Sequence, residues 1–149
     1  MASDDGTGLD KLEQGAWQGF VRACLALRDE VDAELEAEHQ LPLSSYEVLR
    51  ELADAPGRRM RMCDLAEAVG LSRSGLSRLV DRLGQARLVR RQACDADGRG
   101  QFAVLTARGL RLLHRAQPVH EQAVRARFTE LFSEDELERM SGYWQRILT

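Results

Sequence analysis

The stretch LAEAVGLSRSGLSRLVDRL, residues 65–83, decides the fold of this chain. Its first half has apolar residues at helical spacing, Gly70 supplies a turn, and Ser72 is a suitable N-cap for a second helix. The second helix has an apolar stripe made of Leu76, Leu79, Val80 and Leu83. We therefore expect a helix, a tight turn and a second helix whose apolar side is buried.

The other side of the second helix is rich in arginine and serine. An arginine guanidinium can form paired hydrogen bonds with a guanine edge or a phosphate, and a serine hydroxyl can bond either group. The early part of such a helix enters the major groove in helix-turn-helix proteins. We therefore expect a DNA-binding regulator, and the candidate DNA contacts on this helix are Ser72, Arg73, Ser74, Gly75, Ser77, Arg78 and Arg82.

The role of each candidate stays open at this point. A base contact and a backbone contact are both consistent with the early arginines and serines, since half or more of protein–DNA hydrogen bonds go to the backbone. Ser72 caps the helix, and the free N–H groups behind it could meet a phosphate. Arg82 lies one turn further on and suits a phosphate contact or an ion pair. Gly75 costs about 1 kcal/mol relative to alanine in a helix, so it is either tolerated or allows close approach to DNA.

The charge distribution agrees with DNA binding, although the net charge of the chain is −3. Residues 1–56 carry 4 basic and 13 acidic side chains, whereas residues 57–100 carry 10 arginines and 5 acids. Residues 101–149 carry 7 basic and 6 acidic side chains. The basic part coincides with the helix-turn-helix, as an electrostatic DNA footprint requires. The alternative is that these arginines, including Arg58, Arg59 and Arg61, only solvate the surface.

Length and composition indicate one cytoplasmic domain. The chain has 149 residues, of which 44% are hydrophobic and 30% charged. No apolar run approaches the roughly 20 residues of a membrane span, and the acidic start lacks the features of a signal peptide. The 3 cysteines and 3 histidines form no disulfide framework and no metal motif. We expect no enzyme activity, metal, cofactor or membrane association, since no catalytic or phosphate-binding arrangement can be defended.

The segments around the helix-turn-helix follow the same rules. Residues 9–38 form a long helical candidate that ends before Pro42. Ser44 and Glu47 have the spacing of a capping box for a helix to about residue 55, and residues 58–61 suit a short extended segment. Residues 88–93 and 101–105 predict two strands, and DADGRG at 95–100 predicts the turn between them. These strands form a β-hairpin, or wing.

The C-terminal part is predicted to be helical. Thr106 caps a helix to about residue 131 that should kink at Pro118, and Ser133 and Glu136 form a capping box for a last helix. The predicted fold is mainly α with a small β-hairpin wing. One domain, residues 1–149, contains a winged helix-turn-helix lobe at about 44–106 and dimerisation helices at about 9–40 and 107–149. The simplest partner for these terminal helices is a second copy across a two-fold axis.

Over residues 12–148 the chain resembles the multiple antibiotic resistance regulator (MarR) family of bacterial transcription factors. The resemblance is strongest at 65–91 and continues in DGR at 97–99 of the wing. LTARG at 105–109 is similar to the family's Leu-Thr-x-x-Gly entry to its fifth helix. The resemblance implies a homodimer that binds double-stranded DNA at a pseudo-palindromic operator. It usually implies a repressor that is released by a small anion, an oxidant or a metal.

The resemblance also implies further sites. Arg99 is similar to the family's minor-groove arginine, and Asp97 could hold it by an ion pair. The wing departs from the family in having glycines where many members carry larger residues. A pocket for a small-molecule effector, between the dimer helices and the lobe, would be lined by Trp17, Arg22, Tyr46 and Arg50. The alternatives are a winged helix that binds another protein, and a regulator that senses oxidants through a cysteine.

The cysteines and aromatic residues have ordinary interpretations beside these functional ones. Cys24 lies among apolar residues and is expected to be a small buried hydrophobe, whereas peroxide-sensing relatives carry their cysteine nearer Phe20. Cys63 in the first turn of a helix and Cys94 beside the wing are positions that an oxidant could reach. The remaining large aromatics are expected in the core or a dimer interface, namely Trp17, Tyr46 and Trp144.

Overall fold

The computed structural model describes residues 8–94 and 100–149. Its helices are α1 (Lys11–His39), α2 (Leu43–Asp54), α3 (Met62–Ala68), α4 (Arg73–Gln85), α5 (Ala107–Arg127) and α6 (Glu134–Leu148). The strands are β1 (Arg59–Arg61), β2 (Val89–Ala93) and β3 (Gln101–Leu105), and the 3-10 turns are η1 (Pro56–Arg58) and η2 (Thr129–Leu131). The predicted fold class, a mainly α winged helix-turn-helix, is confirmed.

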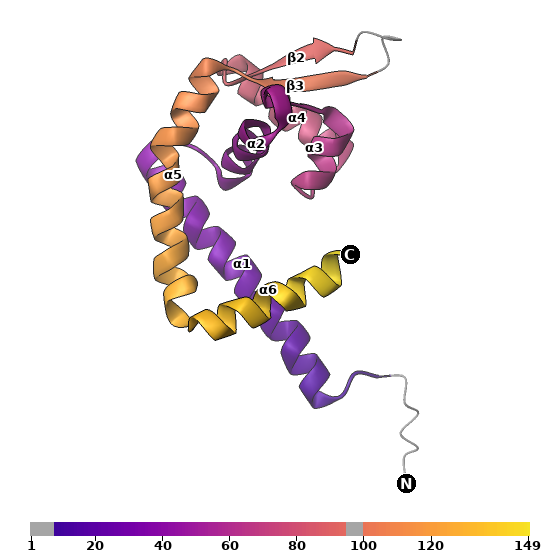
Figure 1. Ribbon diagram of the computed structural model, residues 1–149, viewed down its shortest axis with the longest axis vertical. Coiled ribbons are helices and arrows are strands. Elements are labelled where there is room, and N and C mark those ends of the chain that lie inside the picture. Colours follow the sequence, from indigo (N-terminus) through magenta and orange to yellow (C-terminus); the bar gives the residue numbers. More distant parts are fainter. Residues whose placement is uncertain (1–7, 95–99) are drawn as a thin grey trace.

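The elements form a lobe and an arm (Figure 1). The short helices α2, α3 and α4 and the small sheet make the lobe at one end of the molecule. α1 packs against α5 below it, and α6 lies across the N-terminal half of α1, where the rings of Phe20 and Trp144 are 5.2 Å apart. Of the helices that the structure describes, none is both long and apolar enough to cross a membrane.

The core of the lobe lies under the predicted apolar stripe of α4. Leu76, Leu79, Val80 and Leu83 are all buried. They join a cluster with Leu49, Leu52 and Leu65, each fully inaccessible to solvent. Fully burying one leucine side chain stabilises the fold by about 1.5–3 kcal/mol, so this stripe holds α4 firmly with its other side outward.

The sheet has one strand more than the predicted hairpin. The short extended segment predicted at 58–61 contains β1, which pairs antiparallel with β3, and the strand order is β1-β3-β2. Arg59 lies opposite Val104 and Arg61 opposite Phe102. On the other side of β3, Arg90 lies opposite Val104 and Gln92 opposite Phe102. The base of the wing is therefore anchored to the segment that leads into the helix-turn-helix.

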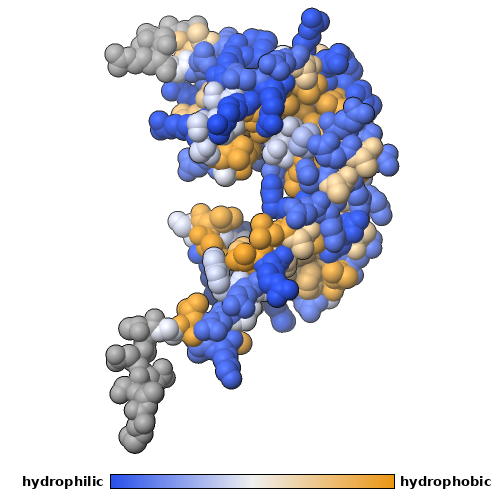
Figure 2. Space-filling model, turned by 180° about the vertical axis from the view of Figure 1, so that it is seen from behind, coloured by the Kyte–Doolittle hydropathy of each residue, from blue (hydrophilic) through white to orange (hydrophobic). Residues whose placement is uncertain are grey.

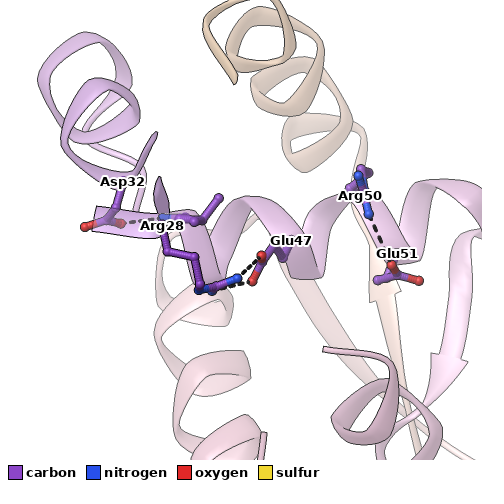
Figure 3. Close-up of polar contacts among 6 residues, drawn as sticks. Arg28, Asp32, Glu47, Arg50 and Glu51 are labelled. Atoms are coloured by element: carbon purple, nitrogen blue, oxygen red, sulfur yellow. Dashed lines mark hydrogen bonds and ion pairs between the residues drawn. The ribbon is translucent and has the colours of Figure 1, made fainter. Parts of the chain in front are cut away.

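The start of α2 differs from its prediction (Figure 3). The expected capping box of Ser44 and Glu47 does not form, because the helix begins at Leu43 after Pro42. The backbone N–H of Leu43 instead donates to Asp32 Oδ1 of α1 at 2.7 Å. Glu47 accepts two hydrogen bonds from Arg28, at 2.8 and 3.1 Å. Both acids thus connect α1 to α2.

The LTARG segment joins the wing to α5 by close backbone contact. Thr106 caps α5 as predicted, since its Oγ1 accepts from the Gly109 N–H at 3.0 Å. The same hydroxyl donates to the carbonyl of Arg87 at 2.7 Å. A Cβ on Gly109 would lie only 2.2 Å from the Leu88 carbonyl oxygen, so this position requires glycine. α5 continues through Pro118 but ends at Arg127, four residues before the predicted end.

Candidate nucleic-acid interface

The exposed side of α4 carries most of the predicted DNA contacts. Ser72, Arg73, Ser74, Arg78 and Arg82 are all exposed there, opposite the buried stripe. Ser72 is the N-cap, and its Oγ accepts from the Gly75 N–H at 3.1 Å. A Cβ on Gly75 would lie 3.0 Å from that hydroxyl, so the glycine leaves room for the cap. The first turn of α4 therefore offers a capped N-terminus with two arginines nearby.

Ser77 is placed differently from the other candidates. It is half-buried, and both its hydroxyl and its carbonyl accept hydrogen bonds from Arg91 Nη2, at 2.9 and 3.1 Å. The same nitrogen donates to Asp81 Oδ1 at 2.8 Å, while Nη1 donates to Gln101 Oε1 at 2.8 Å. One guanidinium thus links α4 to both strands of the wing.

Sequence reasoning missed Arg91, although a signal was present. Residues of a strand alternate between its two faces, so Arg90 and Arg91 must point to opposite sides of the sheet. One of them therefore faces α4, and an arginine that is half-buried there needs acceptors. The turn between α3 and α4 is formed as predicted. Gly70 has a φ of +68°, a backbone conformation that favours glycine.

The two wing residues predicted to contact DNA, Asp97 and Arg99, lie outside the described residues. The strands that lead to the tip are described as far as Cys94 and from Gly100. The N–H of Cys94 donates to the Gly100 carbonyl at 2.9 Å, which continues the ladder of the wing beyond its strands. The hairpin that would carry these residues is therefore in place.

The residues predicted to line an effector pocket lie on two helices, two on α1 and two on α2. Trp17 and Arg22 are exposed on the N-terminal half of α1, and Trp17 packs on Phe20 at 6.2 Å between ring centres. Tyr46 is buried in the lobe, where its ring stacks on His120 of α5 at 4.4 Å. Arg50 is exposed and lines a hollow of about 300 Å³ between α2 and α5, with Ala53, Asp54, Arg58, Leu110, Leu113, His114 and Gln117.

A second hollow of about 200 Å³ lies where α1, α2 and α5 meet. Its lining combines apolar residues with two ion-paired arginines, and consists of Leu27, Arg28, Val31, Leu43, Glu47, His120, Val124, Arg127 and Phe128. Arg28 pairs with Glu47, and Arg127 of α5 pairs with Glu30 and Glu34 of α1. The hydrogen bonds that Arg28 donates to Glu47 raise the pKa of Arg28 above its ordinary value. This hollow is therefore bordered by one contact that joins arm and lobe and by another that joins the two arm helices.

The environment of the stacked pair Tyr46 and His120 shifts both pKa values in the direction that favours the neutral side chains. Burial lowers the pKa of His120 below its ordinary value of 6.5, and the charge of Arg50 lowers it further. Burial also raises the pKa of Tyr46. Both rings are therefore neutral near pH 7, as their packing between α2 and α5 requires.

The cysteines correct one expectation, whereas a dimer-interface position of the terminal aromatics stays a prediction. Cys24 was expected to be buried but is exposed on α1 in the single chain, as is Cys63 on α3, whereas Cys94 is half-buried. Trp17 and Trp144 are also exposed, with 61% and 37% of their surface accessible, so only Tyr46 of the three predicted aromatics is in the core. The reason is that, within residues 8–94 and 100–149, no further element packs over this side of α1 and α6.

Comparison with known proteins decides the family of this lobe-and-arm architecture. The sequence model of the MarR family matches residues 39–100, from the end of α1 to the wing. The transcriptional regulator HosA of Escherichia coli O111:H- is 32% identical over 113 residues, which cover 74% of this chain and 76% of HosA. The chain belongs to the MarR family.

Two solved MarR structures from Streptomyces coelicolor match nearly the whole chain. The MarR family regulator AbsC is 35% identical, with a TM-score of 0.87 over 95% of each chain. The MarR family regulator Sco3205, solved in complex with DNA, is 36% identical, with a TM-score of 0.87 over 95% of this chain and 88% of its own. The predicted MarR resemblance is therefore confirmed for the lobe and for both terminal helices.

Proposed function

We propose that this MarR family regulator is a homodimeric repressor that reads a pseudo-palindromic operator in double-stranded DNA. The observation that carries the proposal is the exposed side of α4, where Arg73, Arg78 and Arg82 stand opposite a fully buried apolar stripe. An amphipathic helix held in this way can enter the major groove without rearranging the lobe. The DNA complex of the related Sco3205 supports this use of the fold.

The terminal helices support the homodimer. Large apolar side chains on α1 and α6 are widely exposed, among them Leu12 at 81%, Ile147 at 70% and Leu148 at 84%. Figure 2 shows hydrophobic side chains at the surface of this arm. Monomeric proteins rarely expose contiguous apolar surface of this kind, and a two-fold axis lets the same surface cover itself. Sedimentation analysis at micromolar concentration should give a dimer mass.

Dimer geometry then sets the mechanism. Each protomer would present one α4 helix to a half-site, and the two major grooves must be about one helical turn of DNA apart. The arm would set that distance through its contact with the lobe, in which Arg28 joins α1 to α2, while Arg127 joins the two arm helices α5 and α1 to each other. A small-molecule effector in the hollow between these helices would release DNA only if it bound the two arm positions with different affinity.

Fluorescence anisotropy with DNA that flanks the protein's own coding region tests the proposal. The wild type should bind this duplex more tightly than a scrambled one, with an affinity that falls steeply with salt. Arg78→Ala should weaken binding by about 5- to 150-fold if Arg78 reads a base. Arg99→Ala should weaken binding through the minor groove, and Arg115→Ala on the exposed side of α5 serves as a matched control.

Two results would contradict the proposal. Equal, weak binding to both duplexes, together with failure to recover any preferred duplex from random DNA, would favour a winged helix that binds another protein. A loss of specific binding after mild peroxide, prevented by replacing the exposed Cys63 or the half-buried Cys94 with serine, would favour a redox-sensing regulator instead of a ligand-released one.

A further inference from the structure

The small sheet has an outer face that the DNA-reading helix does not use. In register, Arg59 and Arg61 of β1 lie beside Val104 and Phe102 of β3, and Arg90 of β2 lies on the other side of Val104. Paired residues of antiparallel strands point to the same side of a sheet. Arg59, Arg61, Arg90, Gln92, Phe102 and Val104 therefore share one face, which we call the outer sheet face.

Packing confirms which face is which. Ala103, Leu105 and Val89 belong to the core cluster, whereas Val104 does not, although only 7% of its surface is accessible. Val104 is flanked in register by the long side chains of Arg59 and Arg90, and aliphatic arginine stems commonly cover apolar neighbours in this way. The outer sheet face therefore lies away from the core cluster and carries three arginines that are exposed in the described part of the chain.

Two of these arginines are held in place by an aromatic ring. The guanidinium carbon of Arg59 lies 4.7 Å from the centre of the Phe102 ring, and that of Arg61 lies 5.9 Å from it. An arginine stacked on an aromatic face keeps the N–H donors at its edge available for a second partner. Within residues 8–94 and 100–149, Arg59, Arg61 and Arg90 are all exposed and take part in none of the ion pairs.

The position of this face points to one kind of partner. Arg91 connects the sheet to α4 by hydrogen bonds, and two strands of the sheet, β2 and β3, form the wing. A set of ordered cations beside a DNA-reading surface is complementary to a row of phosphates. We propose that the outer sheet face binds the phosphate backbone of the DNA that continues beyond each half-site, and so extends the footprint outward from the wing.

This proposal rests on the proposed function, and it additionally requires that the DNA duplex extends beyond the operator. The contacts would be sequence-independent, and they would exist only on a duplex that reaches past the wing. The operator for the test is the duplex that the full-length protein recovers from random DNA. A short duplex ends with the operator, and a long one adds about one helical turn, roughly 10 base pairs, of arbitrary sequence at each end.

The test compares the wild type with the triple variants Arg59→Gln/Arg61→Gln/Arg90→Gln and Arg59→Lys/Arg61→Lys/Arg90→Lys on both duplexes over a salt series. We expect the wild type to bind the long duplex at least about tenfold more tightly at low salt. The glutamine variant should lose this advantage, and its salt slope on the long duplex should fall by about 1 for each phosphate contact removed. The lysine variant should keep most of the advantage, because lysine also binds phosphate.

Several outcomes would overturn the proposal. A wild type that binds both duplexes equally has no contacts with flanking DNA. A glutamine variant that loses affinity equally on both duplexes would assign these arginines to the half-site or to folding. Arg78→Ala should weaken both duplexes alike, which separates failure of this proposal from failure of α4 to read DNA. If no duplex is recovered, the proposed function fails and this inference falls with it.

Discussion

Arg91 and Asp81 join the wing to the recognition helix by a hydrogen bond of 2.8 Å between Nη2 and Oδ1. The two side chains differ in exposure, at 30% and 61%. An ion pair this exposed contributes little by itself. The same guanidinium nitrogen also bonds to the carbonyl and the hydroxyl of Ser77, which are half-buried. The connection therefore depends mainly on the contacts of Arg91 with Ser77, and only secondarily on charge.

The first prediction concerns this connection. Arg91→Met should lower the free energy of unfolding by about 1–2 kcal/mol, because it removes the hydrogen bonds to Ser77. Asp81→Asn should cost less than about 1 kcal/mol. Urea unfolding of both variants measures this difference, and DNA affinity should fall for Arg91→Met because the wing loses its fixed position relative to α4. Equal losses for the two variants would mean that the ion pair dominates.

The second prediction concerns the entry to α5. Gly109→Ala should destabilise the fold by about 1–3 kcal/mol or more, because the new Cβ would meet the Leu88 carbonyl oxygen at 2.2 Å. Gly84→Ala in α4 is the matched control, since its Cβ would make only an ordinary contact at 3.7 Å. That control should be neutral or stabilising by up to about 1 kcal/mol. Thermal unfolding of the two variants distinguishes a required glycine from a merely helical one.

The third prediction concerns the start of α2. Asp32→Ala should cost about 1 kcal/mol in free energy of unfolding, because the Leu43 N–H loses its acceptor. Ser44→Ala should have little effect, since the capping box expected from the sequence does not form. Denaturant titrations of both variants compare the two caps directly. A larger loss of stability for Ser44→Ala than for Asp32→Ala would contradict this prediction and indicate that the capping box forms in solution.

The fourth prediction concerns pH. The pKa of His120 is lowered in the folded protein, so the unfolded chain takes up a proton more readily. Stability should therefore be fully present above the unfolded pKa of about 6.5 and should fall as the pH drops from there toward the folded pKa. His120→Phe retains a ring to stack on Tyr46 and should remove this part of the pH dependence. The measurement is the free energy of unfolding of the wild type and of His120→Phe at pH 8 and at pH 5, and an equal difference between the two pH values in both proteins would contradict the prediction.

The sequence by itself determined the order of elements and the recognition helix. Apolar spacing places Leu76, Leu79, Val80 and Leu83 on one side of α4. The arginines lie at the positions between them and therefore point to the opposite, polar side of the amphipathic helix. Ser72, Thr106 and Ser133 mark helix starts as predicted, since N-capping is decided within three residues of the cap. Local rules were sufficient at these three caps but failed at Ser44, where the N–H of Leu43 bonds to Asp32 of α1 instead.

Only the tertiary structure decided the contacts made across long sequence separations. Asp32 rather than Ser44 caps α2, Arg91 rather than a residue of α4 holds Ser77, and β1 joins the sheet as its third strand. The four residues predicted for an effector pocket lie on α1 and α2, and spacing along a helix does not say how these two helices meet. In each case the donor and its acceptor are brought together by burial of the core, and burial depends on the whole chain.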